Sequence, residues 1–166
     1  GIRGGGVNPL RGQNNVQGAC DMGGLPNVLT GYQAVDNLNV IKRLEDLWNV
    51  TGLPTTPGLK VTEMIPKAHD GEFKAMYIIG ENPLVSDPDL NHAEDCFNHL
   101  EFLVVQDIFL TETANYADVI LPAAAWPEKT GTVTNTNRQV QMGRKAVEPP
   151  GEAREDWSIT VDIAHA

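Results

Sequence analysis

The sequence has few cysteines and lacks the common short nucleotide-binding motifs. Cys20 and Cys96 are its two cysteines, and two thiols cannot complete an iron–sulfur cluster or a structural zinc site by themselves. A disulfide between them is the less favoured alternative, because a cytoplasmic protein, which we expect here, keeps its thiols reduced. Neither a G-x-G-x-x-G fingerprint nor a Walker A lysine is present. A ligand site must therefore be built from other residues.

Basic residues and long apolar runs are also scarce. The chain has 12 Lys and Arg against 22 Asp and Glu, a formal net charge of −10. This excess of negative charge argues against a nucleic acid or an anionic membrane surface as the partner. No apolar run approaches the ~18 residues of a transmembrane helix, so we expect no membrane insertion. The first residues, GIRGGGVNPLRG, hold neither an initiator Met nor the apolar stretch of a signal peptide. We expect an internal piece of a longer protein.

The segment 6–23, GVNPLRGQNNVQGACDMG, has neither helical nor strand periodicity. Its glycines let the backbone turn sharply and approach a ligand closely. Its amide side chains offer many hydrogen-bond donors and acceptors, at Asn8, Gln13, Asn14, Asn15 and Gln17. Arg11 is the one charge before Asp21 in this segment, and its guanidinium suits a carboxylate or a phosphate. The segment predicts a site for a polar ligand.

The rest of the chain predicts an α/β fold with a parallel sheet. Two apolar runs, at 73–79 and 102–105, are typical of buried strands, and a third, short strand is predicted at 119–121. Helical segments are expected between them, one starting at Ser86-Asp87-Pro88 with Asp87 as its cap and one at 111–116. This alternation of strand and helix implies parallel pairing in a three-layer, Rossmann-like arrangement. Ligands of such sheets bind beyond the carboxyl ends of the strands.

The remaining elements are expected outside this alternation. Residues 1–37 are predicted to form loops with short helical turns. Helices are expected at 38–50, where Ile41, Leu44, Leu47 and Trp48 share one face, and at 61–69, after a linker at 51–58. A hairpin or an extended arm is expected at 131–146. A final helix is expected at 154–165, with Trp157, Val161 and Ala164 on one face.

Four stretches of the sequence together resemble molybdopterin-dependent formate dehydrogenases. They are 6–23, YIIGENPLVSDPD at 77–89, the block 100–141 that begins LEFLVVQDIFLTETANYADVILP, and the ending PGEAREDWSITVDIA. Because these blocks agree in order over nearly the whole chain, it is similar to an internal part of the catalytic (alpha) subunit, in the DMSO reductase family. The resemblance implies that 1–166 is part of the molybdopterin oxidoreductase domain, with a cofactor and substrate loop at 1–37, a helical connector at 38–72 and a nucleotide-binding part at 73–166.

The resemblance also implies a cofactor, a substrate and partners. The cofactor is molybdopterin guanine dinucleotide with molybdenum or tungsten, and formate is oxidised to carbon dioxide. The [4Fe-4S] cluster of such subunits, and their metal-bound cysteine or selenocysteine, have no counterpart in this chain. The implied partners are therefore the remaining domains of the parent subunit and iron–sulfur electron-transfer subunits, and we expect the chain alone to be inactive. Two alternatives stay open: a related oxidoreductase with another substrate, and a non-catalytic scaffold without pterin.

Within the segment 6–23, the resemblance gives roles to three residues. Arg11 is implied to bind the formate carboxylate beside the metal, and the alternative is a pair with a local acid or with the pterin phosphates. Gln13 and Asn14 are implied to bind the pterin or its pyrophosphate. Cys20 is expected to be a buried thiol. Later in the chain, Arg138 and Gln139 either contact the cofactor or lie on a strand surface.

The strand ends supply the nucleotide-binding candidates. Gly80, Glu81, Asn82 and Ser86 follow the first strand, where a glycine and a helix N-terminus favour an anion, although a plain strand-to-helix turn would look the same. At the end of the second strand, Asp107 can pair with guanine and Gln106 can bond a ribose or a base. Thr111 and Thr113 can supply hydroxyls, and the alternative is that Asp107 or Thr111 caps the following helix. For His92 and His99 we expect surface or capping roles.

Overall fold

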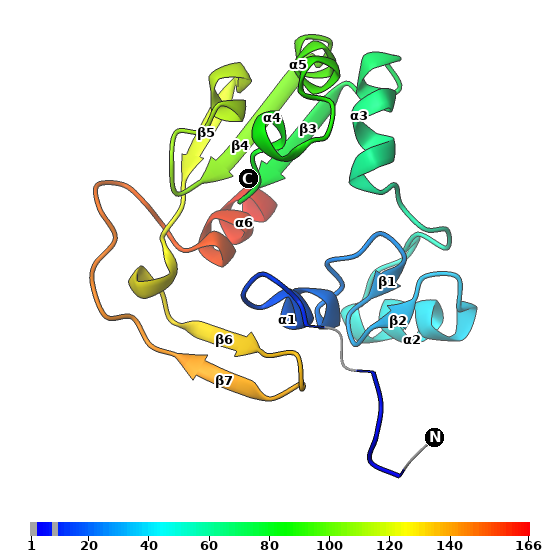
Figure 1. Ribbon diagram of the computed structural model, residues 1–166. Coiled ribbons are helices and arrows are strands. Elements are labelled where there is room, and N and C mark those ends of the chain that lie inside the picture. Colours follow the sequence, from blue (N-terminus) through cyan, green and yellow to red (C-terminus); the bar gives the residue numbers. More distant parts are fainter. Residues whose placement is uncertain (1–2, 8–9) are drawn as a thin grey trace. The chain divides into compact units, whose positions relative to one another are not determined.

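The computed structural model describes residues 3–7 and 10–166, which form two compact units. The first unit consists of residues 1–59 and 131–143, and the second of 60–130 and 144–166. Figure 1 shows the elements of both in chain order. Each unit is described by itself.

The first unit is built from two short helices and two antiparallel strand pairs. The helices are α1 (Val16–Asp21) and α2 (Leu38–Trp48). Strand β1 (Val28–Leu29) pairs with β2 (Gln33–Ala34), and β6 (Gly131–Thr134) pairs with β7 (Val140–Gly143). The β6–β7 pair confirms the hairpin predicted at 131–146. The β1–β2 pair was not predicted, because two-residue strands are too short to show periodicity.

Helix α2 confirms the helix predicted at 38–50, with an earlier end. Asn37 caps its start, because its side chain accepts a hydrogen bond from the Asn39 backbone N–H at 3.1 Å. Asn49 follows the helix in the left-handed conformation, with φ of 54°. Ile41 and Leu44 are buried, whereas Leu47, placed on the same apolar face by the sequence, is 73% exposed. Within this unit, the apolar face is covered only along its first turns.

The second unit contains a parallel sheet of three strands. These are β3 (Ala75–Ile79), β4 (Phe102–Asp107) and β5 (Val119–Pro122), in the order β3-β4-β5. Ile79 lies opposite Gln106, and Gln106 lies opposite Leu121, so the carboxyl ends of the strands meet at one edge. All three predicted strands are confirmed, as is their parallel pairing.

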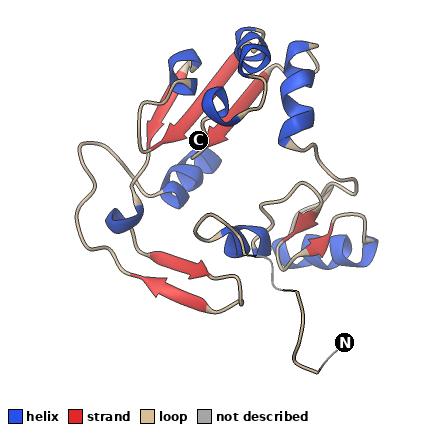
Figure 2. Ribbon diagram, in the orientation of Figure 1, coloured by secondary structure: helices blue, strands red, loops and turns tan. Residues whose placement is uncertain are grey.

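Helices cover both faces of this sheet (Figure 2). One face packs against α3 (Val61–His69) and α5 (Leu90–Asn98) in a core made of Ile65, Ala68, Ile78, Ala93, Cys96, Phe97, Leu103, Val105 and Ala114. Side chains alternate along a strand, so Gln106 points to the opposite face, where it bonds α6 (Asp156–His165). Short turns of helix complete the unit, at α4 (Pro83–Ser86), η1 (Thr113–Tyr116) and η2 (Trp126–Glu128).

Two local predictions in this unit were wrong. The helix expected to start at Ser86-Asp87-Pro88 starts instead at Leu90, and its cap is Asp89, whose carboxylate accepts from the His92 N–H at 3.2 Å. Asp87 is not the cap, because its carboxylate accepts from the Asp89 N–H at 2.9 Å and shapes the turn before the helix. Strand β3 is not buried throughout, since it is an edge strand and Ile79 is 49% exposed.

The final helix is confirmed, but its apolar face is largely exposed. Ile159 is the residue of α6 that is buried. Trp157 is 64% exposed and Val161 is 41% exposed, although the sequence placed both on one apolar face. Among the described residues, no helix is both long and apolar enough to span a membrane.

Candidate functional site

Arg11 is a half-buried cation without an acidic partner in the described part of the chain. Its Nη1 lies 3.5 Å from the Sγ of Cys20, a buried free thiol in α1. No carboxylate of residues 3–7 or 10–166 lies within ion-pair distance of the guanidinium. The local acid that the sequence left open as a partner is therefore not found among these residues. The geometry leaves the Arg11 charge available to an anion.

The residues that follow Arg11 are held by Asn15. Asn15 has φ of 60° and comes directly before α1. Its side-chain oxygen accepts a hydrogen bond from the Thr134 N–H at 2.9 Å, which ties this segment to β6. Gly18 makes room for that amide, because a Cβ at Gly18 would lie 2.1 Å from the Asn15 oxygen. The sequence gave Asn15 only a general role as a polar ligand, so this link was missed.

Gln13 and Asn14 are exposed and make no side-chain hydrogen bond to another described residue. Asn8, which the sequence included among the polar groups, lies outside the described residues. Arg138 and Gln139 lie in the turn between β6 and β7, where both are exposed and Arg138 has φ of 64°. Of the predicted amides of segment 6–23, Gln13 and Asn14 thus remain free in the described structure, whereas Gln17 is buried and donates to Asp21 Oδ1 at 2.8 Å.

In the second unit, Gly80 directly follows β3 and starts a loop whose side chains are hydrogen-bonded to one another. Gly80 has φ of 63°, a conformation that favours glycine. Its N–H donates to the Gln106 carbonyl at 2.9 Å, and a Cβ at this position would meet nothing within 4 Å. The Glu81 carboxylate accepts from the Ser86 hydroxyl at 2.7 Å. Gly80, Glu81 and Ser86 therefore lie in one short loop that follows β3.

The Asn82 side chain joins this loop to Glu112 and to Thr113, the first residue of η1. Its oxygen accepts from the Thr113 hydroxyl at 2.7 Å and from the Thr113 N–H at 3.2 Å. Its amide nitrogen donates to Glu112 Oε2 at 2.7 Å, and this bond lowers the pKa of the Glu112 carboxyl. Thr113 is fully buried. The sequence did not identify Glu112, because nothing in its spacing ties it to a loop 30 residues earlier.

Thr111 and Asp107 each bond the backbone of their own turn. The Thr111 hydroxyl accepts from the Ala114 N–H at 3.3 Å, as expected of a residue that caps η1. Asp107 Oδ1 accepts from the Phe109 N–H at 3.1 Å. Asp107 is partly exposed, and its second carboxylate oxygen has no hydrogen-bond partner among the described residues. Asp107 and Glu81, whose two hydrogen bonds both reach Oε1, are therefore carboxylates at the strand ends that each retain one oxygen without a described partner.

Gln106 lies inside the unit rather than on its surface. Its side chain is 0% exposed. The Tyr77 hydroxyl donates to its oxygen, and its amide nitrogen donates to Asp156 Oδ1 at 2.8 Å. The Asp156 carboxylate also pairs with the Lys129 ammonium. Burial acts to raise the pKa of Asp156, but the hydrogen bonds from Lys129 and Gln106 and the Lys129 charge lower that pKa overall.

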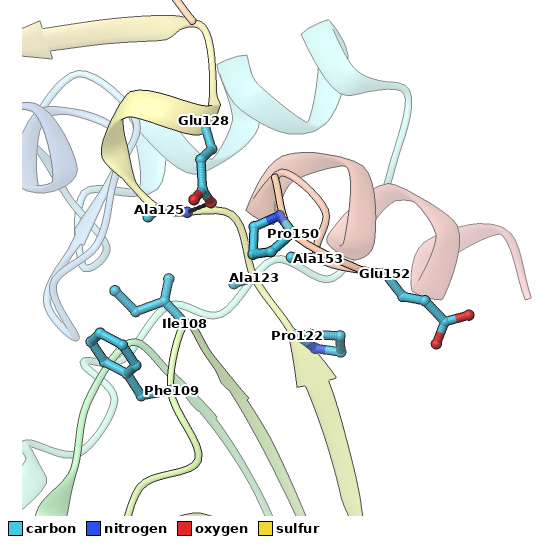
Figure 3. A pocket seen from close by; sticks show the side chains of 9 residues that line it. All are labelled: Ile108, Phe109, Pro122, Ala123, Ala125, Glu128, Pro150, Glu152 and Ala153. Atoms are coloured by element: carbon cyan, nitrogen blue, oxygen red, sulfur yellow. Dashed lines mark hydrogen bonds between the residues drawn. The ribbon is translucent and has the colours of Figure 1, made fainter. Parts of the chain in front are cut away.

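A pocket of about 310 Å³ lies directly beyond the carboxyl ends of β4 and β5. Its walls are mainly apolar, and Figure 3 shows Ile108 and Phe109 on one side and Ala123, Pro150 and Ala153 nearby. Glu128 accepts a hydrogen bond from the Ala125 N–H at 2.7 Å within this wall. A concave apolar site at this edge of a parallel sheet is a usual location for a ligand.

The whole chain matches one family. The family model for molybdopterin oxidoreductases covers residues 1–166. The chain therefore belongs to the molybdopterin oxidoreductase family, as its sequence motifs indicated. The structure of acetylene hydratase from Pelobacter acetylenicus matches 63% of this chain and 15% of its own, with a TM-score of 0.57 and 23% identity. That likeness supports the fold alone.

Curated relatives in this family include formate dehydrogenases. The chain is 60% identical over 164 residues to the F420-dependent formate dehydrogenase subunit alpha of Methanocaldococcus jannaschii, covering 99% of this chain and 24% of that protein. It is 46% identical over 159 residues to formate dehydrogenase H of Escherichia coli, covering 96% of this chain and 22% of that protein. The chain thus spans about a quarter of the length of these relatives.

Proposed function

We propose that this chain is part of the catalytic alpha subunit of a formate dehydrogenase and helps to hold molybdopterin guanine dinucleotide. The observation that carries the proposal is the half-buried Arg11, a cation without a carboxylate partner in the described structure, within an amide-rich segment. Family membership supports the class of cofactor, and the named relatives support the substrate. In this proposal the substrate is formate, and the partners are the other domains of the subunit and iron–sulfur electron-transfer subunits.

The donors and acceptors of the described residues fit such a cofactor. Gln13 and Asn14 present free amides that suit the pterin or the pyrophosphate. Gly80 leaves open space at the sheet edge, where Glu81, Asn82 and Ser86 form a fixed loop. Among the nucleotide candidates Asp107 and Glu81 each keep one carboxylate oxygen without a described partner. The proposal assigns the amine and N1–H of guanine to Asp107, with Thr111 following the same strand. Bound there with molybdenum or tungsten, the cofactor would accept the two electrons of formate oxidation.

The proposal also assigns a role to each of three residue ranges. Residues 1–37 contribute the cofactor and substrate loop, 38–72 the helical connector, and 73–166 the nucleotide-binding part. Within that last range, residues 131–143 belong to the first unit. The charge of Arg11 would orient a small carboxylate, and a fixed guanidinium fork does so without reorganisation of solvent.

The test is carried out on the full-length protein. Metal and pterin analysis should find molybdenum or tungsten with pterin, and formate should reduce an artificial dye. If metal and pterin are found but formate does not reduce the dye, the cofactor assignment stands and the protein is a related oxidoreductase with another substrate. Absence of metal and pterin would overturn the proposal in favour of a non-catalytic scaffold.

Arg11→Ala tests the role of the guanidinium. Loss of charge-assisted hydrogen bonds to a carboxylate should raise the formate KM by about ten-fold or more, or abolish turnover, while metal content stays at the wild-type level. Arg11→Lys keeps the charge without the planar fork, and its formate KM should lie between those of wild type and Arg11→Ala. If formate kinetics of Arg11→Ala equal those of wild type, Arg11 does not bind the substrate.

A further inference from the structure

A chain of four polar side chains runs through the second unit and has its centre at Gln106. Tyr77 on β3 donates to Gln106 on β4, which donates to Asp156 at the start of α6, and Lys129 pairs with the other oxygen of Asp156. No element contributes more than one of the four residues. We call these residues, Tyr77, Gln106, Asp156 and Lys129, the Gln106 relay.

The relay fixes which way the Gln106 amide points. Its oxygen faces a hydroxyl donor, and its nitrogen faces a carboxylate acceptor. A flipped amide would place its nitrogen against the Tyr77 hydroxyl and its oxygen against the Asp156 carboxylate, so the second contact would join two acceptors. At 0% exposure, the side chain has no water to replace a lost partner. Each donor therefore meets an acceptor in only one orientation.

The same residue holds the end of the sheet through its backbone. The Gly80 N–H donates to the Gln106 carbonyl at 2.9 Å, and the Ala123 N–H donates to the carbonyl of the next residue, Asp107, at 3.0 Å. All three strand ends are thus joined at residues 106 and 107. Because side chains alternate along a strand, the Asp107 carboxylate lies on the face opposite the relay, with one oxygen free.

We propose that Gln106 and Asp156 are positioning residues, which fix the carboxyl end of β4 and so place Asp107 for the nucleotide, and that Gln106 does not bind the nucleotide itself. The inference rests on the proposed function. It changes the role that the sequence suggested for Gln106, from a ligand of ribose or base to an internal support. It also gives a role to Asp156, Tyr77 and Lys129, which sequence motifs did not single out.

The test exchanges the amide and the carboxylate. Gln106→Glu alone sets two carboxylates against each other in a buried position. In the double variant Gln106→Glu/Asp156→Asn, Tyr77 still donates to residue 106, the new amide at 156 donates to the new carboxylate, and Lys129 donates to the amide oxygen. Gln141→Glu, on the exposed surface of β7, is the control for adding a negative charge.

The readouts are the pterin and guanine nucleotide bound per full-length polypeptide, the Tm, and formate kinetics per bound cofactor. Gln106→Glu should lower occupancy about five-fold or more, and the double variant should return it to within about two-fold of wild type. The formate KM of the loaded fraction should stay at the wild-type value in every variant. A positioning role predicts this rescue, whereas a nucleotide ligand at 106 does not.

The outcomes separate the inference from the proposed function. If wild type binds the cofactor but the double variant stays as empty as Gln106→Glu, Gln106 contacts the nucleotide and the inference is wrong, while the proposed function stands. If the double variant recovers Tm without recovering occupancy, the relay stabilises the fold only, and the positioning role is overturned. A wild type without pterin or guanine nucleotide overturns the proposed function itself.

Discussion

At the scale of single residues, several polar side chains of the second unit are bonded to one another. Glu81 accepts from the Ser86 hydroxyl within the short loop that begins at Gly80, so this contact is local in the sequence. Gln106 and Asn82 turn out to be bonded within the chain, and their partners come from elements 29 to 50 residues away. Such partners leave no signal in local spacing.

Asp156 gives stability a pH dependence whose sign is fixed by its lowered pKa. A carboxyl with a folded-state pKa below its unfolded value stabilises the fold above the unfolded pKa, and this contribution is lost as pH falls through the folded value. Asp156→Asn should therefore destabilise the full-length protein by about 1 kcal/mol at pH 7, a modest value because the side chain is partly exposed. The difference from wild type should shrink below about pH 4.

Urea denaturation of both proteins at several pH values measures this difference. Asp46→Asn is the matched control, since Asp46 is exposed on α2 and has no described partner. A difference between wild type and Asp156→Asn that is constant or grows toward acid would show that Asp156 is not held as a charged acceptor in the folded state.

At the scale of elements, prediction succeeded where a pattern was long and failed where it was short or repeated. The three strands and the helices α2, α3 and α6 follow apolar patterns of several residues, and all are present. The start of α5 was misplaced because Asp87 and Asp89 are both suitable caps. Asp87 instead accepts from the Asp89 N–H, and Asp89 accepts from the His92 N–H at the start of the helix. The exposure of Leu47 and Trp157 depends on what packs against their helices, which the helical pattern does not contain.

The hydrogen bond from the Thr134 N–H on β6 to Asn15, directly before α1, can be broken by adding a single methyl group at Gly18. In Gly18→Ala, the added Cβ would displace the Asn15 side chain, because the two would be 2.1 Å apart. The Thr134 N–H would then lose its acceptor, and we expect a loss of about 1–2 kcal/mol of stability. Thermal melts of the full-length protein measure it.

Gly131→Ala is the control for that substitution, since a Cβ at Gly131 meets nothing within 4 Å. Its Tm should stay near that of wild type. Equal melting temperatures for Gly18→Ala and wild type would show that Asn15 does not need to bond Thr134.

At the scale of the whole molecule, the second unit exposes apolar groups on the sheet and on α6. Tyr77, Ile79, Trp157, Val161 and Ile163 are each at least 39% exposed. Exposed apolar side chains in this number favour contact with another chain or domain. Residues 1–166 produced alone should therefore self-associate and should not oxidise formate when supplied with metal and pterin, because the two cysteines cannot supply an iron–sulfur path.

Light scattering and a formate-dependent dye assay on the isolated chain test both expectations. Trp157→Lys combined with Val161→Lys should reduce the particle size, because two charges interrupt the exposed face. A monodisperse monomer would contradict the expected self-association. Formate oxidation at a rate comparable to that of the full-length protein would contradict the expected inactivity of residues 1–166 alone.

The contact between Asn15 and β6 within the first unit also implies an order of assembly. Asn15 and its partner Thr134 are separated by 119 positions, and β6 and β7 follow residues 60–130 in the chain. During synthesis, α1 therefore cannot contact β6 until most of the second unit has left the ribosome. Closing so long a loop also adds an entropic cost. Folding of the first unit should accordingly be a late, post-nucleation event, and a ribosome stalled after residue 130 would display a first unit that is still incomplete.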